Sequence, residues 1–480
     1  MGMCRTWILT SLLLAACTSD KIEDSGEEAD TDTDTDTDSD TDTDTDTDTD
    51  PNAAIRQMSW TLHKDIESLV YVQWTQKDAG PVSIEFRFDD GAWMEAPSMD
   101  GVVGENTHLL VGIPYAEEAD WQITTGSGEV FLGDTITTGA LPDGMPVPEV
   151  MVADDTQWIG DGNYFLSSIN GSSGGWTGGT YWTYIMDRQG RVMWAQPAPD
   201  RHWTLFTQVS VTGDHILWDE ATKWSDFDYG EASLVHRIYL DEEIDTLSTP
   251  GLHHAFFQLP DETLAWGSKF HDNSEALVEM HPDSPDKIDV LWTCDESWPG
   301  VGSYCESNGL FYDPIRDTYL YSFYTNNSLV EVDRTTGTSL WWAGAVVDGY
   351  TFSPSDAKFR WQHGISYTED RTLLVSSEAY VDGSKRTVVW EYAVDHKAQT
   401  LTELWMFNPG VHAVTNGDAW RLDNGNTLHV VGSSGHIKEA TATGEVVWHV
   451  TFNDNHLLGR GEFITDLYTL VSPAFSGAKR

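Results

Sequence analysis

The segment DRQGRVMW at residues 187–194 recurs as DRTTGTSLW at residues 333–341. Shorter copies are VVW at residues 388–390 and TGEVVW at residues 443–448. The longer copies contain a Gly at the position expected for a tight turn, and all of them end in Trp. We interpret the segment as a repeated β-hairpin in which the Trp packs one sheet against the next.

A second hairpin alternates with the first and closes on an acidic or Asn-Gly turn. Its copies are LPDETL at residues 259–264, TEDRTLL at residues 368–374 and LDNGNTL at residues 422–428. A period of roughly fifty residues, built from short strands with recurrent Trp, is typical of a β-propeller. Helical periodicity is nearly absent. We therefore predict an all-β chain in which residues 150–480 form a six-bladed or seven-bladed propeller.

A smaller domain is predicted over residues 54–141. Alternating stretches such as LVYVQW at 69–74 and IEFRF at 84–88 indicate short strands with one buried face. About seven such strands in under a hundred residues are typical of an immunoglobulin-like or fibronectin-like sandwich. A Pro-rich stretch at residues 142–148 is expected to act as a stiff linker.

The N-terminal residues read as an export signal. Arg5 precedes an apolar stretch at residues 7–16 that is too short to span a membrane as a helix. It ends in LAAC, which resembles the bacterial lipobox, so we expect residues 1–16 to be a signal peptide and Cys17 to be lipidated. An ordinary signal peptide with an incidental cysteine is the alternative. Thr18 replaces the Asp of inner-membrane retention signals, which in a Gram-negative host favours the outer membrane, on its periplasmic face or at the cell surface. No later stretch is long and apolar enough to be a transmembrane helix.

Residues 17–53 are expected to form an acidic tether. Thr and Asp alternate from Thr31, with Ser39 as the one exception, and like charges at every second residue repel one another. The formal net charge of the whole chain is -52. Because nucleic-acid binding needs clustered Lys and Arg, and none occurs here, nucleic acid is excluded as a partner.

The four cysteines agree with an exported protein. Cys4 leaves with the signal peptide and Cys17 is the lipidation site. Cys294 and Cys305 remain, close together in the sequence, and in an oxidising compartment they are expected to form a disulfide. A metal site is the weaker alternative, because two thiolates without flanking His residues make a poor ligand set.

Several stretches resemble the bacterial arylsulfate sulfotransferase (arylsulfotransferase) family, in which a small β-sandwich precedes a six-bladed propeller. The resemblance covers most of residues 54–460. It is carried by HHAF with LPD at residues 253–261, by residues 308–341 with YDP at 312–314, by WQHG at 361–364 and by GDAWRLDNGNTL at 417–428. It implies a periplasmic protein or lipoprotein and a site among inner-strand histidines.

The resemblance implies transfer of a sulfuryl group from an aryl sulfate to a phenol. A neutral histidine attacks the sulfuryl group, and the phenol discharges the sulfohistidine, with no cofactor and no nucleotide sulfate donor. By motif, His363 is the nucleophile, and His254 matches a further site histidine, although Ala255 replaces the family's Asp.

Two further positions depart from the family pattern. Glu306 lies where the family has a His two positions before Asn308, and Tyr324 lies near the position of the family's sulfate-binding Arg. We assign Glu306 as a possible general base and Asn308, Tyr324 and Arg360 as substrate-binding residues. Lys358, Arg360 and Arg421 are the candidate cations, since the sulfuryl oxygens need positive charge beside them.

Non-catalytic interpretations stay open. His253 is expected to point away from the site, because neighbouring residues of a strand face opposite sides. The chief rival is a propeller that binds a protein, a glycan or a small aromatic ligand at its channel mouth. A quinone-dependent dehydrogenase-like propeller is weaker, because no cofactor ligands stand out. Convergence of His254 and His363 beside a cation favours the enzyme.

Overall fold

The computed structural model describes residues 52–477, apart from 177, 223–232, 272–273, 299–300, 302–304 and 454. The predicted signal peptide, Cys17 and nearly all of the tether lie outside the described residues. Within the described part of the chain, no helix has the length and apolar character needed to cross a membrane.

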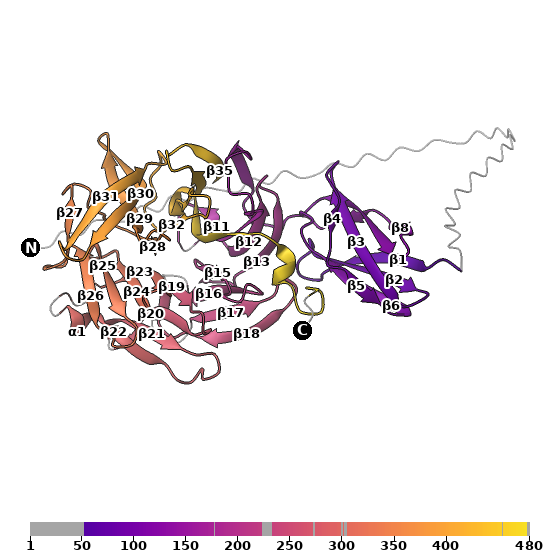
Figure 1. The fold of residues 1–480 in the computed structure, drawn as a ribbon, viewed down its shortest axis with the longest axis horizontal. Coiled ribbons are helices and arrows are strands. Elements are labelled where there is room, and N and C mark those ends of the chain that lie inside the picture. Colours follow the sequence, from indigo (N-terminus) through magenta and orange to yellow (C-terminus); the bar gives the residue numbers. More distant parts are fainter. Residues whose placement is uncertain are drawn as a thin grey trace, which may run out of the picture. The chain divides into compact units, whose positions relative to one another are not determined.

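The first nine strands form two sheets, ordered β1-β2-β6 and β4-β3-β7-β8, with β5 on β3 and β9 on β7 (Figure 1). Alternate residues of β2 and β3, such as Val72 and Ile84, are buried in one core, as expected for a sandwich. The strands are β1 (Ile55–Leu62), β2 (Val70–Gln76), β3 (Gly80–Phe88), β4 (Met94–Glu95), β5 (Met99–Gly101), β6 (Gly104–Leu110), β7 (Glu118–Thr125), β8 (Val130–Leu132) and β9 (Ile136–Thr137).

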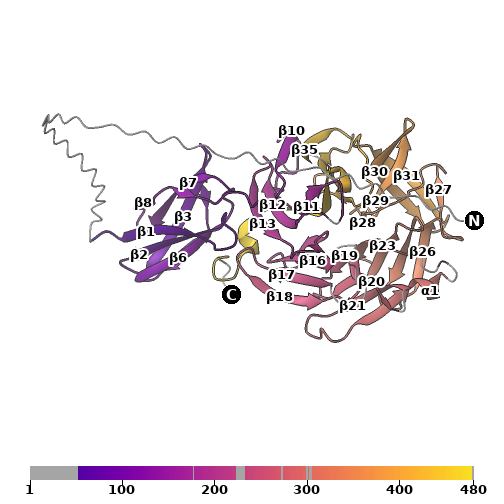
Figure 2. The same ribbon diagram turned by 180° about the vertical axis from the view of Figure 1, so that it is seen from behind.

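The later strands form six sheets of four or five strands among the described residues (Figures 1 and 2). Their orders are β13-β12-β11-β36, β14-β16-β17-β18 with β15 on β16, β19-β20-β21-β22, β23-β24-β25-β26, β27-β31-β30-β29-β28 and β10-β35-β34-β33-β32. The predicted all-β propeller is confirmed.

The bounds of these elements follow in chain order. They are β10 (Pro148–Ala153), β11 (Tyr164–Ser173), β12 (Tyr181–Asp187), β13 (Val192–Pro197), β14 (His202–Trp203), β15 (Thr207–Val209), β16 (Ile216–Thr222), β17 (Leu234–Ile238), β18 (Glu243–Ser248), β19 (Leu252–Gln258), β20 (Leu264–His271), β21 (Ser274–Met280), β22 (Asp289–Thr293), α1 (Cys294–Ser297), β23 (Ser307–Asp313), β24 (Thr318–Phe323), β25 (Ser328–Asp333), β26 (Ser339–Gly344), β27 (Thr351–Ser353), β28 (Ile365–Tyr367), β29 (Leu373–Val381), β30 (Ser384–Asp395), β31 (Thr400–Phe407), β32 (Asp418–Arg421), β33 (Thr427–Val430), η3 (Gly432–Ser434), β34 (His436–Ala440), β35 (Val446–Phe452), β36 (His456–Ile464) and η4 (Leu467–Leu470).

Strands from the two ends of this region complete each other's sheets. β10 pairs antiparallel with β35, and β36 pairs antiparallel with β11. Such pairing closes the ring of sheets and leaves fewer exposed strand edges. Pro148, which the sequence places in the linker, is the first residue of β10 and lies opposite Phe452.

The repeated hairpins are present where the sequence predicts them. Residues 187–194 turn from β12 into β13, and the Asp187 carboxylate accepts the backbone N–H groups of Gln189 and Arg191. Gly190 has φ 79°, a left-handed conformation that glycine adopts without steric cost. Trp194 and Trp448, which end two of the copies, are fully buried. The repeated Trp residues therefore pack the sheets.

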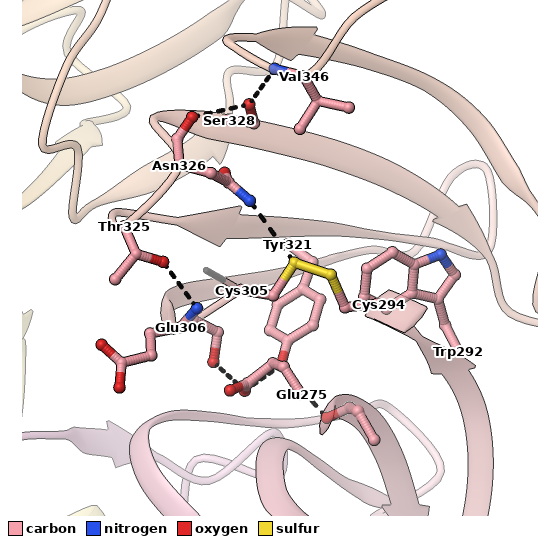
Figure 3. Close-up of a disulfide and its surroundings, with 12 residues drawn as sticks. Glu275, Trp292, Cys294, Cys305, Glu306, Tyr321, Thr325, Asn326, Ser328 and Val346 are labelled. Atoms are coloured by element: carbon pink, nitrogen blue, oxygen red, sulfur yellow. Dashed lines mark hydrogen bonds between the residues drawn. A yellow bond between two sulfur atoms is a disulfide. The ribbon is translucent and has the colours of Figure 1, made fainter. Parts of the chain in front are cut away.

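A disulfide joins Cys294 and Cys305, as predicted, across a Cα–Cα distance of 6.4 Å (Figure 3). Both cysteines are buried beside Trp292 in an apolar cluster. The neighbouring residue is Glu306, whose backbone N–H donates to Thr325 Oγ1 at 2.9 Å. The disulfide therefore fixes the segment that carries a predicted site residue.

Candidate active site

His254 and His363 lie in the wall of one cavity of about 320 Å³. They come from β19 and from the loop before β28, and Tyr324 joins them from the end of β24. These positions are far apart in the sequence but meet because the sheets of a propeller surround a common axis. The lining residues are Trp176, His254, Tyr324, Trp361, His363, Val414 and Thr415.

Aromatic side chains form most of this wall. The Tyr324 ring stacks on the His363 ring, with centroids 6.1 Å apart and an interplanar angle of 18°. Its centroid is also 6.1 Å from the Trp361 ring and 6.2 Å from the His254 ring. Trp176 lies edge-on to His254, with centroids 6.4 Å apart. The cavity therefore suits a flat aromatic ligand.

His363 is held as a neutral imidazole. Its Nδ1 lies 2.9 Å from the backbone carbonyl of Trp361. Because a carbonyl only accepts, Nδ1 carries the proton and Nε2 keeps its lone pair. Burial lowers the pKa of His363 to about 4, so the ring is uncharged at neutral pH.

The backbone before His363 is strained. Trp361 has φ 47°, in the left-handed region that non-glycine residues rarely adopt, and Asn327 Oδ1 accepts its N–H at 2.7 Å. This conformation leaves the Trp361 ring about half exposed, at 48%. The same residue therefore lines the cavity with its ring and orients His363 with its carbonyl.

His254 is bound to its neighbour His253, with 2.7 Å between the two Nδ1 atoms. The expectation that His253 points away from the site is wrong, since its side chain is fully buried and reaches Glu275. The pairing of β19 with β20 shifts register between Leu252 and Phe256. This irregularity breaks the alternation of faces on which the prediction rested.

Glu306 forms an ion pair with Lys269. Its second oxygen accepts the Tyr324 hydroxyl at 2.6 Å. Burial acts to raise the pKa of the Glu306 carboxyl, but the hydrogen bonds from Lys269 and Tyr324 outweigh it and lower the pKa below its ordinary value. Glu306 is therefore an ionised counter-ion to Lys269, and a weak proton acceptor at neutral pH.

Asn308 lies deeper than the cavity. It is buried, its side-chain amide donates to the Gln362 carbonyl, and it lines a smaller cavity with His363 and Arg460. Its Oδ1 atom has no hydrogen-bond partner among the described residues. Asn308 therefore supports the backbone before His363.

The three cations proposed from the sequence do not line the cavity around the two histidines. Arg360 and Lys358 line a separate cavity of about 500 Å³ that also contains Glu378. Arg421 forms an ion pair with Glu391 at 2.6 Å. Arg360 is adjacent to Trp361 in sequence, but its backbone bonds to β29. Its N–H donates to Ser377 Oγ, and its carbonyl accepts from the N–H of Glu378, so Arg360 lies away from the cavity of the two histidines.

Sequence reasoning missed Lys269, Trp176 and the two residues bonded behind His254, which are His253 and Glu275. Lys269 reaches the site by strand pairing, because β20 lies between β19 and β21. Trp176 lies between β11 and β12 in a Gly-rich stretch without a recognisable motif. For His253, the HHAF sequence contained the signal, but the register shift that turns it inward is not visible in the residues.

The arylsulfotransferase (ASST) family model matches residues 307–453. Among curated proteins, no significant match to the chain is found.

Solved structures with similar folds have low identity. A protein of unknown function from Bacteroides caccae is 14% identical, covers 60% of this chain and 93% of its own, and has a TM-score of 0.40. The β-propeller domain of Cps50 (Swd1) from Myceliophteria thermophila is 13% identical over 64% of this chain and 86% of its own, with a TM-score of 0.37. Virginiamycin B lyase from Staphylococcus aureus is 10% identical over 66% of this chain and 100% of its own, also with a TM-score of 0.37.

The matched stretch runs from β23, the strand of Asn308, through the loop of His363 to the end of β35, and stops before β36. It does not include β19, the strand of His254. The resemblance to the arylsulfotransferase family that the sequence motifs indicated is thus confirmed over residues 307–453.

Proposed function

We propose that the cavity transfers a sulfuryl group from an aryl sulfate to a phenol through His363. The observation that carries the proposal is that His363 is neutral, has its lone pair on Nε2 and lies in one aromatic cavity with His254. Nε2 attacks sulfur while the sulfur–oxygen bond to the aryl group breaks, and the phenolate leaves. An acceptor phenol then attacks sulfur, the nitrogen–sulfur bond breaks and His363 is regenerated.

The aromatic wall supplies binding for the aryl ring. Trp176, Tyr324 and Trp361 present three ring systems to the cavity, and stacking of this kind favours planar ligands. Lys269 is linked to this wall through Glu306, which it binds and which in turn accepts a hydrogen bond from Tyr324. In this proposal Lys269 faces the charge on the sulfuryl oxygens.

The test uses the purified full-length protein in detergent, with 4-nitrophenyl sulfate as donor and phenol as acceptor. Nitrophenol release that depends on phenol in the steady state, and that is lost in His363→Ala, supports the proposal. Asn408→Ala, at an exposed position outside the cavity, is the control. A folded wild-type protein that releases no nitrophenol over a range of aryl sulfates would contradict it.

A second candidate function is binding of a small aromatic ligand without chemistry. It is favoured by the Glu306 carboxylate beside the cavity and by the lack of an arginine among the lining residues in the described part of the chain. Glu306→Gln separates the two functions. The variant removes the negative charge bound to Lys269, so affinity for an aryl sulfate should rise if the site holds sulfate. A ligand that is bound through the carboxylate should be lost instead.

We propose further that the chain is an exported lipoprotein. LAAC at residues 14–17 and the apolar stretch before it support lipidation of Cys17. Metabolic labelling of a bacterial host with a fatty-acid analogue should label the wild-type protein and not Cys17→Ala. Equal labelling of both proteins would exclude Cys17 as the lipidated residue.

A further inference from the structure

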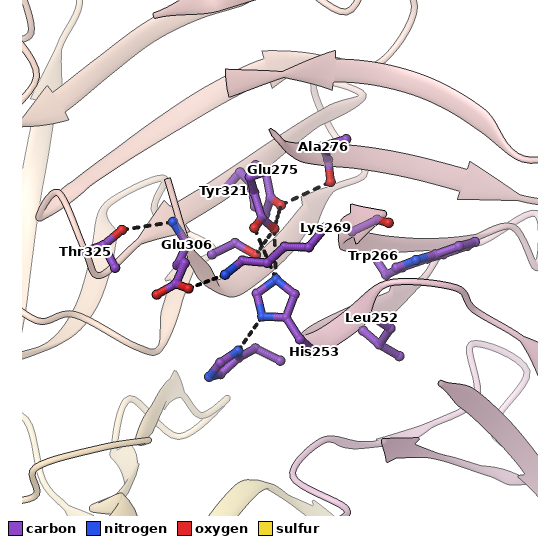
Figure 4. A network of polar contacts seen from close by, with 12 residues as sticks. Leu252, His253, Trp266, Lys269, Glu275, Ala276, Glu306, Tyr321 and Thr325 are labelled. Atoms are coloured by element: carbon purple, nitrogen blue, oxygen red, sulfur yellow. Dashed lines mark hydrogen bonds and ion pairs between the residues drawn. The ribbon is translucent and has the colours of Figure 1, made fainter. Parts of the chain in front are cut away.

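A chain of buried polar groups leads from His254 to His253 and on to Glu275. Figure 4 shows the part of it formed by His253 and Glu275. His254 Nδ1 lies 2.7 Å from His253 Nδ1, and His253 Nε2 lies 3.1 Å from Glu275 Oε1. His253 is fully buried, and Glu275 is 2% exposed. Only His254, at the other end of the chain, lines the aromatic cavity.

Hydrogen-bond donors around Glu275 fix the direction of this chain. The Tyr321 hydroxyl and Ser307 Oγ both donate to Glu275 Oε1 at 2.6 Å. A carboxylate in this setting accepts from His253 as well, so His253 carries its proton on Nε2. In a singly protonated His253 the lone pair is then on Nδ1, and in this tautomer Nδ1 accepts from Nδ1–H of His254. This order leaves the lone pair of His254 on Nε2.

The backbone is shaped to make room for this chain. The register shift in β19 allows His253 and His254, which are adjacent in sequence, to reach the same network. Gly267 lies opposite on β20, where a Cβ atom would come within 2.4 Å of Ser307 Oγ and 2.6 Å of the Tyr321 hydroxyl. Any side chain larger than hydrogen would therefore displace the groups that hold Glu275.

We propose that His254 is the general base for the acceptor phenol. His253 and Glu275 are positioning residues, which keep the lone pair of His254 on Nε2 and receive the proton that His254 passes on. The inference rests on the proposed function and specifies its second half. As the phenol oxygen attacks the sulfur on His363, His254 Nε2 takes the phenol proton. Nδ1–H of His254 passes to His253, and Nε2–H of His253 passes to Glu275. One proton has then moved from the phenol to Glu275, and both histidines are neutral again.

The electrostatics of the site favour a relay over a lasting imidazolium. Burial holds the pKa of His254 well below its ordinary value, and the positive charge of Lys269 lowers it further. A cation at His254 is therefore costly, whereas a proton on Glu275 neutralises a buried carboxylate. The titratable groups that face His254 are His253 on its own strand, Lys269 on β20, and Tyr324 and His363 in the cavity wall, with Glu275 and Tyr321 beyond His253.

The test measures the two half-reactions of the full-length protein separately. A burst of nitrophenol without acceptor reports sulfation of His363, and the decay of the sulfo-enzyme with added phenols reports its discharge. Glu275→Gln keeps the shape of the side chain but cannot take up the proton. We expect an unchanged burst and a discharge at least tenfold slower with phenol, a conservative part of the range for general-base catalysis. Acidic phenols that are already ionised at the assay pH should discharge the enzyme at the wild-type rate.

Glu331→Gln is the matched control. Glu331 is equally buried, accepts the Tyr367 hydroxyl at 2.9 Å and lies on β25 away from the cavity. It should affect neither half-reaction. If Glu275→Gln slows both half-reactions equally, or slows all phenols equally, Glu275 has only a structural role and the inference is overturned. A wild-type protein without a burst contradicts the proposed function itself, and the relay with it.

A measurement on the wild-type protein keeps the inference testable if Glu275→Gln does not fold. In protein labelled with ¹⁵N-histidine, the His254 signals are those that disappear in His254→Gln. A proton on Nδ1 and a bare Nε2 support the relay. A proton on Nε2 would overturn it, because that nitrogen then has no lone pair for the phenol proton.

Discussion

Sulfation of His363 should stay fast at pH values where an ordinary histidine is already protonated. Only the neutral imidazole can attack sulfur, and burial lowers the pKa of His363 to about 4. The aryl sulfate donor does not titrate in this range. The pH dependence of the burst therefore reports the protonation state of the nucleophile.

The expected difference is large at pH 5. With a pKa of about 4, roughly nine-tenths of His363 is neutral at pH 5, whereas a histidine at its reference pKa of about 6.5 is only about 3% neutral. The two cases differ by roughly thirtyfold in burst rate. Between pH 7 and pH 5 we therefore expect a nearly flat profile, with a midpoint close to pH 4.

A stopped-flow pH jump makes the measurement possible before acid unfolds the protein. The protein is kept at pH 7.5 and mixed with 4-nitrophenyl sulfate in buffers of pH 3.5 to 7.5, and the initial burst rate is recorded. Tryptophan fluorescence on the same time scale shows whether the fold persists. A midpoint near pH 6.5 in protein that is still folded would refute the assignment of His363 as a buried, neutral nucleophile.

The remaining predictions concern the cavity wall, the disulfide and acid stability. Trp361→Ala removes one ring of the wall and should weaken aryl sulfate binding by about 1 kcal/mol, near fivefold in KM, with little change in kcat; an unchanged KM would show that the ring does not contact substrate. Replacing Cys294 and Cys305 by Ser opens a loop with a sequence separation of 11 and should lower the free energy of unfolding by about 3 kcal/mol in chemical denaturation, whereas reduction of the wild-type protein without any loss would contradict this. His429 is fully buried, and burial lowers its pKa to about 3. Between about pH 6.5 and pH 3 only the unfolded chain therefore binds a proton at His429, and the folded state loses stability as pH falls. This group should account for about 2 kcal/mol of the stability lost between pH 7.5 and pH 5, and His429→Gln should reduce the pH dependence of unfolding by that amount.

The propeller and the meeting of two histidines were predictable because both depend on local patterns. The hairpin at residues 187–194 contains its own turn residues and a buried Trp. The structure of each copy can therefore be predicted from its local sequence, without the contacts it makes to distant residues. The WQHG and HHAF stretches marked His363 and His254 through resemblance to a family, and inner strands of a propeller converge. To predict the propeller and the meeting of the two histidines, only the order of the repeats along the chain is needed.

The partners of the site residues could not be predicted because they depend on strand register. His253 faces inward only because β19 and β20 shift register between Leu252 and Phe256. Lys269 meets Glu306 across two sheets, at a sequence separation that no motif spans. Arg360 is next to Trp361 in sequence, yet the left-handed turn at Trp361 separates their side chains. Each case is a tertiary feature that overrides the alternation of a regular strand.

Glu306 and Tyr324, two positions that differ from the family pattern, are bonded to each other, and Glu306 is also bonded to Lys269. Taken singly, Glu306 and Tyr324 replace two groups that bind sulfate in the resembled family, and either change alone would weaken an anion site. In the structure both are bound to each other, and Glu306 is also bound to Lys269, which supplies a positive charge from a different strand. The triad has no net charge, so it holds Lys269 close to the aromatic wall without leaving a buried charge unpaired. Selectivity of this cavity should therefore depend more on the aromatic ring of its ligand than on the anion, and broad acceptance of aryl groups without an anion would favour binding over transfer.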